Sequence, residues 1–226
     1  MIEILSDFLS SLCIRSVRRE IMRALWTVVM GCVLVSGWAS AQERVPDKEL
    51  GKYCIGLTLN ANILVMDPNV KVTADALKGS AVMVKDKEQI ALVIPDAKLA
   101  EGVAAVSDKS VTPFAHLWFK DLVPQSEGKA IAADKLRRLK IQAGKESLEA
   151  DLCFVGLQKN AKGDLELLIY GKGKEPILKP VLEAHEEAQD KPLLLDLEVP
   201  ADKPMVLTIR VLGKYRTKIE VASAGK

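Results

Sequence analysis

The chain has 226 residues and a formal net charge of +2, and aromatic residues make up only 4% of it. Residues 1–41 carry 4 basic and 3 acidic residues, so that 28 Lys and Arg face 27 Asp and Glu in residues 42–226. Charges of both signs are interspersed there, which excludes the basic surface of a nucleic-acid-binding domain. A segment of this length is sufficient for one domain of ordinary size.

The first predicted element is a secretory signal peptide within MRALWTVVMGCVLVSGWASAQERV, residues 22–45. Arg23 gives it a basic start, no charged residue follows until after Trp38, and Ala39-Ser40-Ala41 supplies the small residues of a cleavage site. The apolar core is shorter than the roughly 20 residues of a membrane-spanning helix. We therefore predict translation from Met22, cleavage after Ala41, and a mature chain that has no membrane span and lies in the periplasm or outside the cell.

Strand after strand is predicted in the mature chain, because apolar residues alternate with polar ones along most of it. In the first run, Tyr53, Ile55 and Leu57 share one face. The predicted strands cover residues 53–59, 81–85, 89–94, 114–120, 136–142, 148–157, 165–169, 193–199, 205–211 and 215–221. Short turns separate them, two of which carry Gly163 and Gly213. This pattern predicts an all-β antiparallel β-sandwich of the jelly-roll or immunoglobulin-like kind.

One short helix is predicted over residues 180–189. Pro180 can occupy its first turn, and Val181, His185 and Ala188 would form one apolar stripe. The alanine-rich residues 95–107 show no alternation and predict a helical or coil element. We expect residues 42–226 to form a single domain, with a subdivision near residue 144 as the alternative.

Two cysteines belong to the mature chain, Cys54 and Cys153. An even pair in an oxidising compartment predicts a disulfide, and the alternative is a pair of buried free thiols. The sequence has no Cys-x-x-Cys spacing. This argues against thioredoxin-type redox chemistry and against a zinc knuckle.

The only aromatic-dense stretch is TPFAHLWFKDL, which holds one of the two histidines. Strict alternation would place Phe114, His116 and Trp118 on one face of a strand. Such a face could stack sugar rings or bind a peptide, and the alternative is a strand that is packed on both faces. The other histidine, His185, has three glutamates near it but lacks three convergent ligands. We therefore predict no metal and no cofactor.

Catalytic motifs are missing from the sequence. There is no Gly-x-Ser-x-Gly, and GKGKEP at residues 171–176 lacks the spacing of a phosphate-binding loop. No motif of a known family is present either. The main hypothesis is an exported, non-enzymatic structural or binding module whose partner is a protein or polysaccharide of the cell envelope. The alternatives are a carbohydrate-binding module centred on Trp118 and a hydrolase that uses His116 or distant carboxylates.

Overall fold

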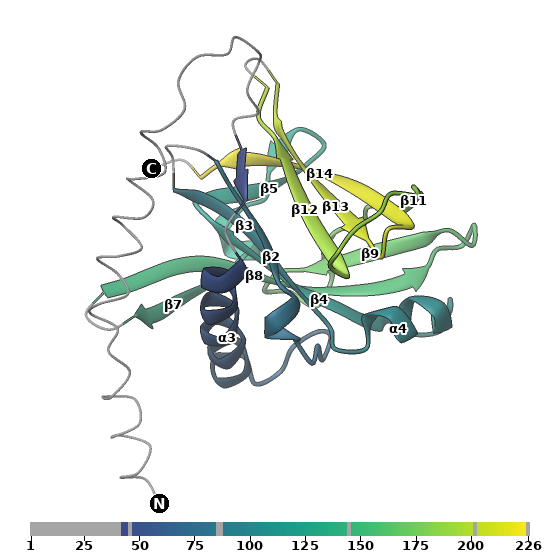
Figure 1. The fold of residues 1–226 in the computed structure, drawn as a ribbon, viewed down its shortest axis with the longest axis horizontal. Coiled ribbons are helices and arrows are strands. Elements are labelled where there is room, and N and C mark those ends of the chain that lie inside the picture. The colour runs from purple at the N-terminus through teal and green to yellow at the C-terminus, as the bar shows by residue number, and fades with distance from the viewer. Residues whose placement is uncertain (1–41, 45–46, 85–87, 144–145, 201–202, 225–226) are drawn as a thin grey trace, which may run out of the picture. The chain divides into compact units, whose positions relative to one another are not determined.

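The computed structural model describes residues 42–44, 47–84, 88–143, 146–200 and 203–224. The predicted signal peptide at residues 1–41 and the alternative boundary near residue 144 lie outside the described residues. Residues 40–143 and 147–226 cluster as one compact unit. Figure 1 shows the fold of this unit.

Strands account for most of the described elements. They are β1 (Gln42–Arg44), β2 (Ser80–Val84), β3 (Gln89–Pro95), β4 (Thr112–Lys120), β5 (Leu122–Ser126), β6 (Lys129–Ala130), β7 (Arg137–Ala143), β8 (Glu146–Lys159), β9 (Leu165–Tyr170), β10 (Pro176–Leu178), β11 (Glu183–Ala184), β12 (Leu193–Glu198), β13 (Met205–Val211) and β14 (Tyr215–Ser223). The helices are α3 (Asp47–Leu64) and α4 (Leu99–Ala105), with two short 3-10 turns, η1 (Ala76–Lys78) and η2 (Ala133–Lys135).

The strands form two antiparallel sheets. The 8-stranded sheet has the order β1-β2-β3-β4-β8-β9-β10, with β7 paired to β8, and the 6-stranded sheet has the order β12-β13-β14-β5-β6, with β11 paired to β14. Most neighbours in each sheet are consecutive in sequence, as short turns require. The predicted mostly β fold of antiparallel strands is confirmed.

The main hydrophobic core lies between the two sheets. Every second residue of the central strands points into it, for example Val93, Leu117 and Cys153 from the 8-stranded sheet and Leu195 and Leu207 from the 6-stranded sheet. These five side chains are at most 1% exposed. The period of two that predicted the strands is therefore the period with which they fill this core.

The other face of the 8-stranded sheet is also buried, because helix α3 packs on it (Figure 1). Trp118 and Phe154 of the sheet share a second hydrophobic cluster with Leu50, Cys54 and Leu57 of the helix. The predicted strand at residues 53–59 is therefore wrong. The helix is apolar on most of its circumference, so an alternating pattern fits it by coincidence, whereas its buried residues follow the spacing of a helix.

The predicted helix at residues 180–189 is also wrong. The backbone N–H of Leu182 donates to the carbonyl oxygen of Leu165 in β9, and Glu183 and Ala184 then pair with β14 as β11. Pairing with both sheets satisfies this backbone better than an isolated helical turn, and tertiary pairing overrides the local helix preference. Helix α4, in contrast, falls within the range predicted as helical or coil.

The chain also passes between the sheets at Asp121, which separates β4 in the 8-stranded sheet from β5 in the 6-stranded sheet. Asp121 has a φ of 53°, a left-handed conformation that Asp tolerates better than most residues. At strand β12 the two sheets approach closely. There the backbone N–H of Leu195 in β12 donates to the hydroxyl oxygen of Ser80 in β2, 3.2 Å away. This hydrogen bond satisfies one backbone donor on the edge of β12 that no strand covers among the described residues.

Candidate functional site

The predicted aromatic face on β4 is buried. Phe114 is 1% exposed, His116 1% and Trp118 2%. His116 and Trp118 point toward the α3 side of the sheet, whereas Phe114 lies in the core between the sheets, because the register shifts between Pro113 and Ala115. The three rings do not share one face. A sugar stacks only on an exposed ring, so strand β4 presents no such platform to solvent.

His116 is enclosed by apolar side chains. Its ring meets the Phe154 ring edge to face, with the centroids 5.0 Å apart. Neither ring nitrogen has a hydrogen-bond partner among the described residues, and burial lowers the pKa of His116 from 6.5 to about 4. A general base must be able to reach the proton that it removes from a substrate, and it needs a partner that orients its ring. The buried His116 ring meets neither condition in the structure.

The second histidine lies in a surface ion-pair network. His185 Nε2 is 3.1 Å from Glu187 Oε2, and Glu187 also accepts from the guanidinium of Arg210. These hydrogen bonds to His185 and Arg210 lower the pKa of Glu187. Among the described residues no three His, Cys, Asp or Glu side chains come together as a metal site.

Cys54 and Cys153 are both buried free thiols in the structure. Cys54 lies on the side of helix α3 that packs against the 8-stranded sheet, and Cys153 lies in the core between the sheets, so the 8-stranded sheet separates them. Burial raises the pKa of Cys54 to about 11 and that of Cys153 to about 12. A disulfide between them would require one thiol to cross the sheet, and the intact mass of the unreduced mature protein checks which state exists.

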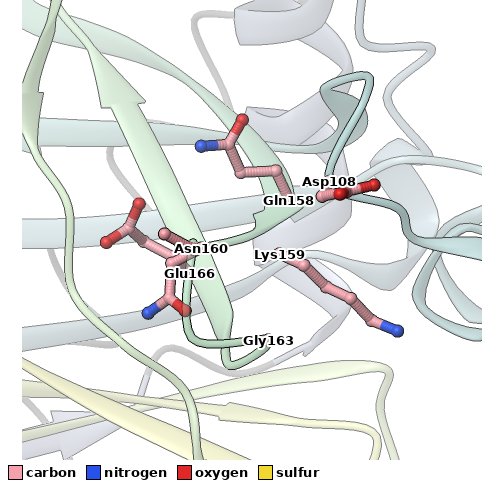
Figure 2. Close-up of a pocket in the computed structure, with 7 residues that line it drawn as sticks. Asp108, Gln158, Lys159, Asn160, Gly163 and Glu166 are labelled. Carbon is pink, nitrogen blue, oxygen red and sulfur yellow. The ribbon is translucent and has the colours of Figure 1, made fainter.

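An open polar depression of about 720 Å³ lies at the turn between β8 and β9 (Figure 2). Its lining includes Asp108, Lys159 and Glu166, but Figure 2 shows the side chains of Lys159 and Glu166 pointing in different directions. Asn160 accepts from the backbone N–H groups of Lys162 and Asp164 and is thereby engaged in holding the turn. The depression results from the shape of the hairpin turn and shows no converging polar groups.

A second concavity has a different character. It holds about 350 Å³, is mostly apolar, and lies between β10 and the segment that follows β6. We call it the β10 groove. It is lined by Ile131, Lys135, Gly173, Lys174, Glu175, Pro176 and Ile177.

Hydrogen bonds hold the two walls of the β10 groove together. The backbone N–H of Lys172 donates to the carbonyl oxygen of Lys135, 2.8 Å away. Asn69 Nδ2 donates to the carbonyl oxygen of Gly173 at 2.8 Å, and Arg137 Nη2 donates to that of Gly171 at 3.1 Å. These three hydrogen bonds therefore tie residues 171–173 to the segments beside them.

Gly171 is required at this point of contact. A Cβ atom there would lie 2.1 Å from the carbonyl oxygen of Lys135, so only glycine allows the two segments to approach this closely. Arg137 completes the support, because its guanidinium lies 5.5 Å from the centroid of the Phe154 ring and is partly withdrawn from water. Burial lowers the pKa of Arg137 accordingly.

The rim of the β10 groove is predominantly basic. Lys135 and Lys174 are exposed lining residues, and Glu175 is the only acidic one among them. Ile131 and Ile177 are half-buried and form the apolar part. This groove was not predictable from the sequence, since it is built from two turns that share no periodic pattern. The lysines of GKGKEP were its only sign in the sequence.

Comparison of the chain with models of protein families, with curated proteins and with solved structures finds no match in any of the three. Within the described residues, no helix has both the length and the apolar content to cross a bilayer.

Proposed function

We propose that this protein is an exported, non-enzymatic β-sandwich that acts by contact, as a binding module of the periplasm or cell surface. The β10 groove is its binding site, and an extended segment of a partner protein is the ligand. Export rests on the signal sequence at residues 22–41, and the sheets, of the jelly-roll or immunoglobulin-like kind, serve as a scaffold. The observation that carries the proposal is a mostly apolar groove with a lysine rim beside a terminal strand.

The terminal strand supports recognition through the backbone. β10 ends the 8-stranded sheet and pairs with β9 at Pro176 and Leu178, with an irregularity between them at Ile177. Among the described residues no further strand pairs with β10 on its outer side. An extended peptide can add to such an edge by main-chain hydrogen bonds. Pro176 lacks an N–H donor, so this added pairing is short and side-chain contacts must supply most of the affinity.

The side chains of the groove define the chemistry of the partner. Ile131 and Ile177 favour an apolar residue, and Lys135 and Lys174 on the rim favour acidic residues. Exposed ion pairs contribute only about 0–1 kcal/mol each, so the lysines select the partner more than they hold it. The expected ligand is an extended segment in which apolar and acidic residues alternate.

The test is fluorescence polarisation with a labelled eight-residue peptide that alternates leucine and aspartate. We expect the wild-type protein to bind it and Ile177→Asp to weaken binding at least tenfold. The double variant Lys135→Glu/Lys174→Glu should prefer the matching leucine–lysine peptide. Lys162→Glu, a charge reversal at the β8–β9 turn, is the matched control and should bind like wild type. Equal binding by all variants, or no preference between the two peptides, would contradict the proposal.

The two alternative functions have less support. A polysaccharide-binding face requires exposed rings, and Trp118 and its neighbours on β4 are buried. Trp118 is the only tryptophan of residues 42–226, so its emission reports on this face alone. We expect a blue-shifted emission that acrylamide quenches poorly and that no polysaccharide changes. A hydrolase would need a carboxylate pair or an accessible His116. A change in Trp118 emission with one polysaccharide would support the carbohydrate-binding module and the hydrolase again.

A further inference from the structure

The edge of the 8-stranded sheet continues beyond the last residue of β10. Leu178 of β10 lies opposite Ile169 of β9, and Val181 lies opposite Glu166. The step from Leu178 to Val181 equals the step from Ile169 back to Glu166, so the antiparallel register is the same at both points. The chain therefore follows the edge of β9 as far as Val181.

Hydrogen bonds show which way the backbone of this stretch points. The N–H of Leu167 donates to the carbonyl oxygen of Pro180 at 2.9 Å, and the N–H of Leu182 donates to the carbonyl oxygen of Leu165 at 2.8 Å. In an antiparallel pair, consecutive residues direct their backbone groups alternately toward and away from the neighbouring strand. Since Pro180 and Leu182 face β9, the N–H and the carbonyl group of Val181 point away from β9, out of the edge of the sheet.

Lys179 and Val181 together offer an open edge. The same alternation directs the backbone groups of Lys179 away from β9. Within the part of the chain that the structure describes, no hydrogen bond engages the backbone N–H or carbonyl group of either residue. Both side chains are exposed, that of Val181 by 41%. Pro180 lies between them with its nitrogen on the β9 side, so its missing N–H takes no donor from the open edge.

We infer that the ligand strand continues past the β10 groove and pairs with the backbone of Lys179 and Val181, an inference that rests on the proposed function. A strand rises about 3.4 Å per residue, so Val181 lies about 14 Å beyond Ile177 along the edge. An extended ligand of eight residues is about 27 Å long and reaches from the groove past Val181. The groove then supplies side-chain contacts at one end, and the open edge supplies main-chain hydrogen bonds at the other.

The charge of Lys179 favours an acidic partner segment over a second copy of this protein. Two copies that paired along this edge would bring their two Lys179 side chains into the same short stretch, where like charges repel. A lysine on an edge strand discourages such self-pairing. An acidic residue placed beside Lys179 by an added strand is instead attracted. This matches the acidic residues that Lys135 and Lys174 favour at the rim of the β10 groove.

The test compares two replacements of Val181. Val181→Pro removes the outward N–H, a replacement that an edge strand tolerates where this N–H faces solvent. Val181→Ala keeps the N–H and shortens the same side chain, so it is the matched control. In fluorescence polarisation with the eight-residue leucine–aspartate peptide, Val181→Pro should bind about fivefold more weakly than Val181→Ala, the effect of one hydrogen bond. Circular dichroism and thermal melting verify that both variants fold.

A second measurement uses the wild-type protein and stays decisive if Val181→Pro does not fold. Two forms of the eight-residue peptide carry N-methyl groups, one on its leucine nitrogens and the other on its aspartate nitrogens. Successive residues of an extended strand direct their N–H groups to opposite edges, so only one form keeps the donors that face the protein. Because β10 alone offers a short pairing, we expect the open edge to make the two affinities differ at least tenfold.

Equal binding by folded Val181→Pro and Val181→Ala would overturn the inference, and so would equal affinities of the two methylated peptides. The proposed function would stand in either case if Ile177→Asp still weakens binding of the unmethylated peptide. If wild type does not bind that peptide at all, both proposals fail. A wild-type dimer in sedimentation velocity that Val181→Pro abolishes would also overturn the inference, because a second copy would then occupy the edge.

Discussion

Two apolar stretches of this protein end in opposite environments. The central residues of β4 are completely buried, including the polar atoms of His116 and Trp118, whereas helix α3 leaves the aliphatic side chains of Ile55, Leu59 and Ile63 in water. The difference follows from the layers. β4 lies in the middle layer, with the second sheet on one face and α3 on the other, so even its polar atoms are enclosed. α3 is the outermost layer and has only one face to bury. Apolar composition alone therefore does not report exposure.

The largest effect should come from truncation in the middle layer. Trp118→Ala removes a large ring that is 2% exposed and leaves a cavity beneath α3. Replacements of this kind reduce the free energy of unfolding by about 3–5 kcal/mol. Urea denaturation at pH 7 measures the change. A loss below about 1 kcal/mol would mean that the ring is not part of a packed core, and the contrast with α3 would fail.

Acid should lower the free energy of unfolding through His116, the buried histidine of β4. The pKa of His116 is about 4 in the folded protein and 6.5 in the unfolded chain, so between these values the unfolded chain binds more protons. The stabilising effect of the neutral ring is complete above pH 6.5 and is lost as the pH falls to about 4. The difference between the two pKa values corresponds to roughly 3 kcal/mol in the free energy of unfolding.

His116→Leu isolates this contribution, because the other titrating groups are the same in both proteins. The free energy of unfolding should fall less steeply with acid in the variant than in wild type. At pH 7 the variant should be at least as stable, since it removes two unpartnered buried nitrogens. Parallel curves for the two proteins would show that the His116 ring is not buried in its neutral form.

A smaller loss of stability is expected when the ion pair between Arg138 and Asp151 of the same sheet is broken. The Asp151 side chain is 4% exposed, and its two oxygens accept from Arg138 Nε at 3.1 Å and Nη2 at 3.0 Å. Arg138→Ala leaves this carboxylate unpaired, but half of the Arg138 side chain is exposed, so water screens part of the loss. We expect about 1–3 kcal/mol. In the Asp151→Asn background the same replacement should have a much smaller effect, and a double-mutant cycle measures the coupling.

The smallest effect is expected on the outer layer. Leu59→Ala should change the free energy of unfolding of the monomer by less than about 0.5 kcal/mol, because the side chain is exposed before and after unfolding and alanine favours a helix. Urea denaturation provides the measurement. An effect comparable to that of Trp118→Ala would mean that α3 buries its outer face within the monomer.

The strands were predictable because each buries alternate residues. Residues 205–211 were predicted as a strand and form β13, with Leu207 and Ile209 in the core and the half-buried Arg210 on the other face. Helix α3 was not predictable in the same way, since a segment that is apolar on almost every side fits the period of a strand as well as that of a helix.

The error at α3 also explains the error about the candidate site. Alternation correctly placed His116 and Trp118 on the same face of β4, but their exposure depended on whether another layer covers that face. The predicted strand at residues 53–59 supplied no such layer, and the observed helix does. The β10 groove could not be predicted from the sequence for a different reason. Its walls come from segments about 40 residues apart that meet only because Gly171 lets Lys135 pass over it.

The pairing of β14 with β5 has a consequence for how the chain folds. Val221 lies opposite Pro124, so the last strand joins one from the middle of the sequence. Loop closure over such a distance is slow, and sheets of this kind fold in milliseconds to seconds. During synthesis, β5 can pair with β6 at once but has to wait for residues 215–223 before its other neighbour, β14, exists. A chain truncated before β14 would therefore leave unpaired edges on β5 and on β13, and such edges are prone to aggregation.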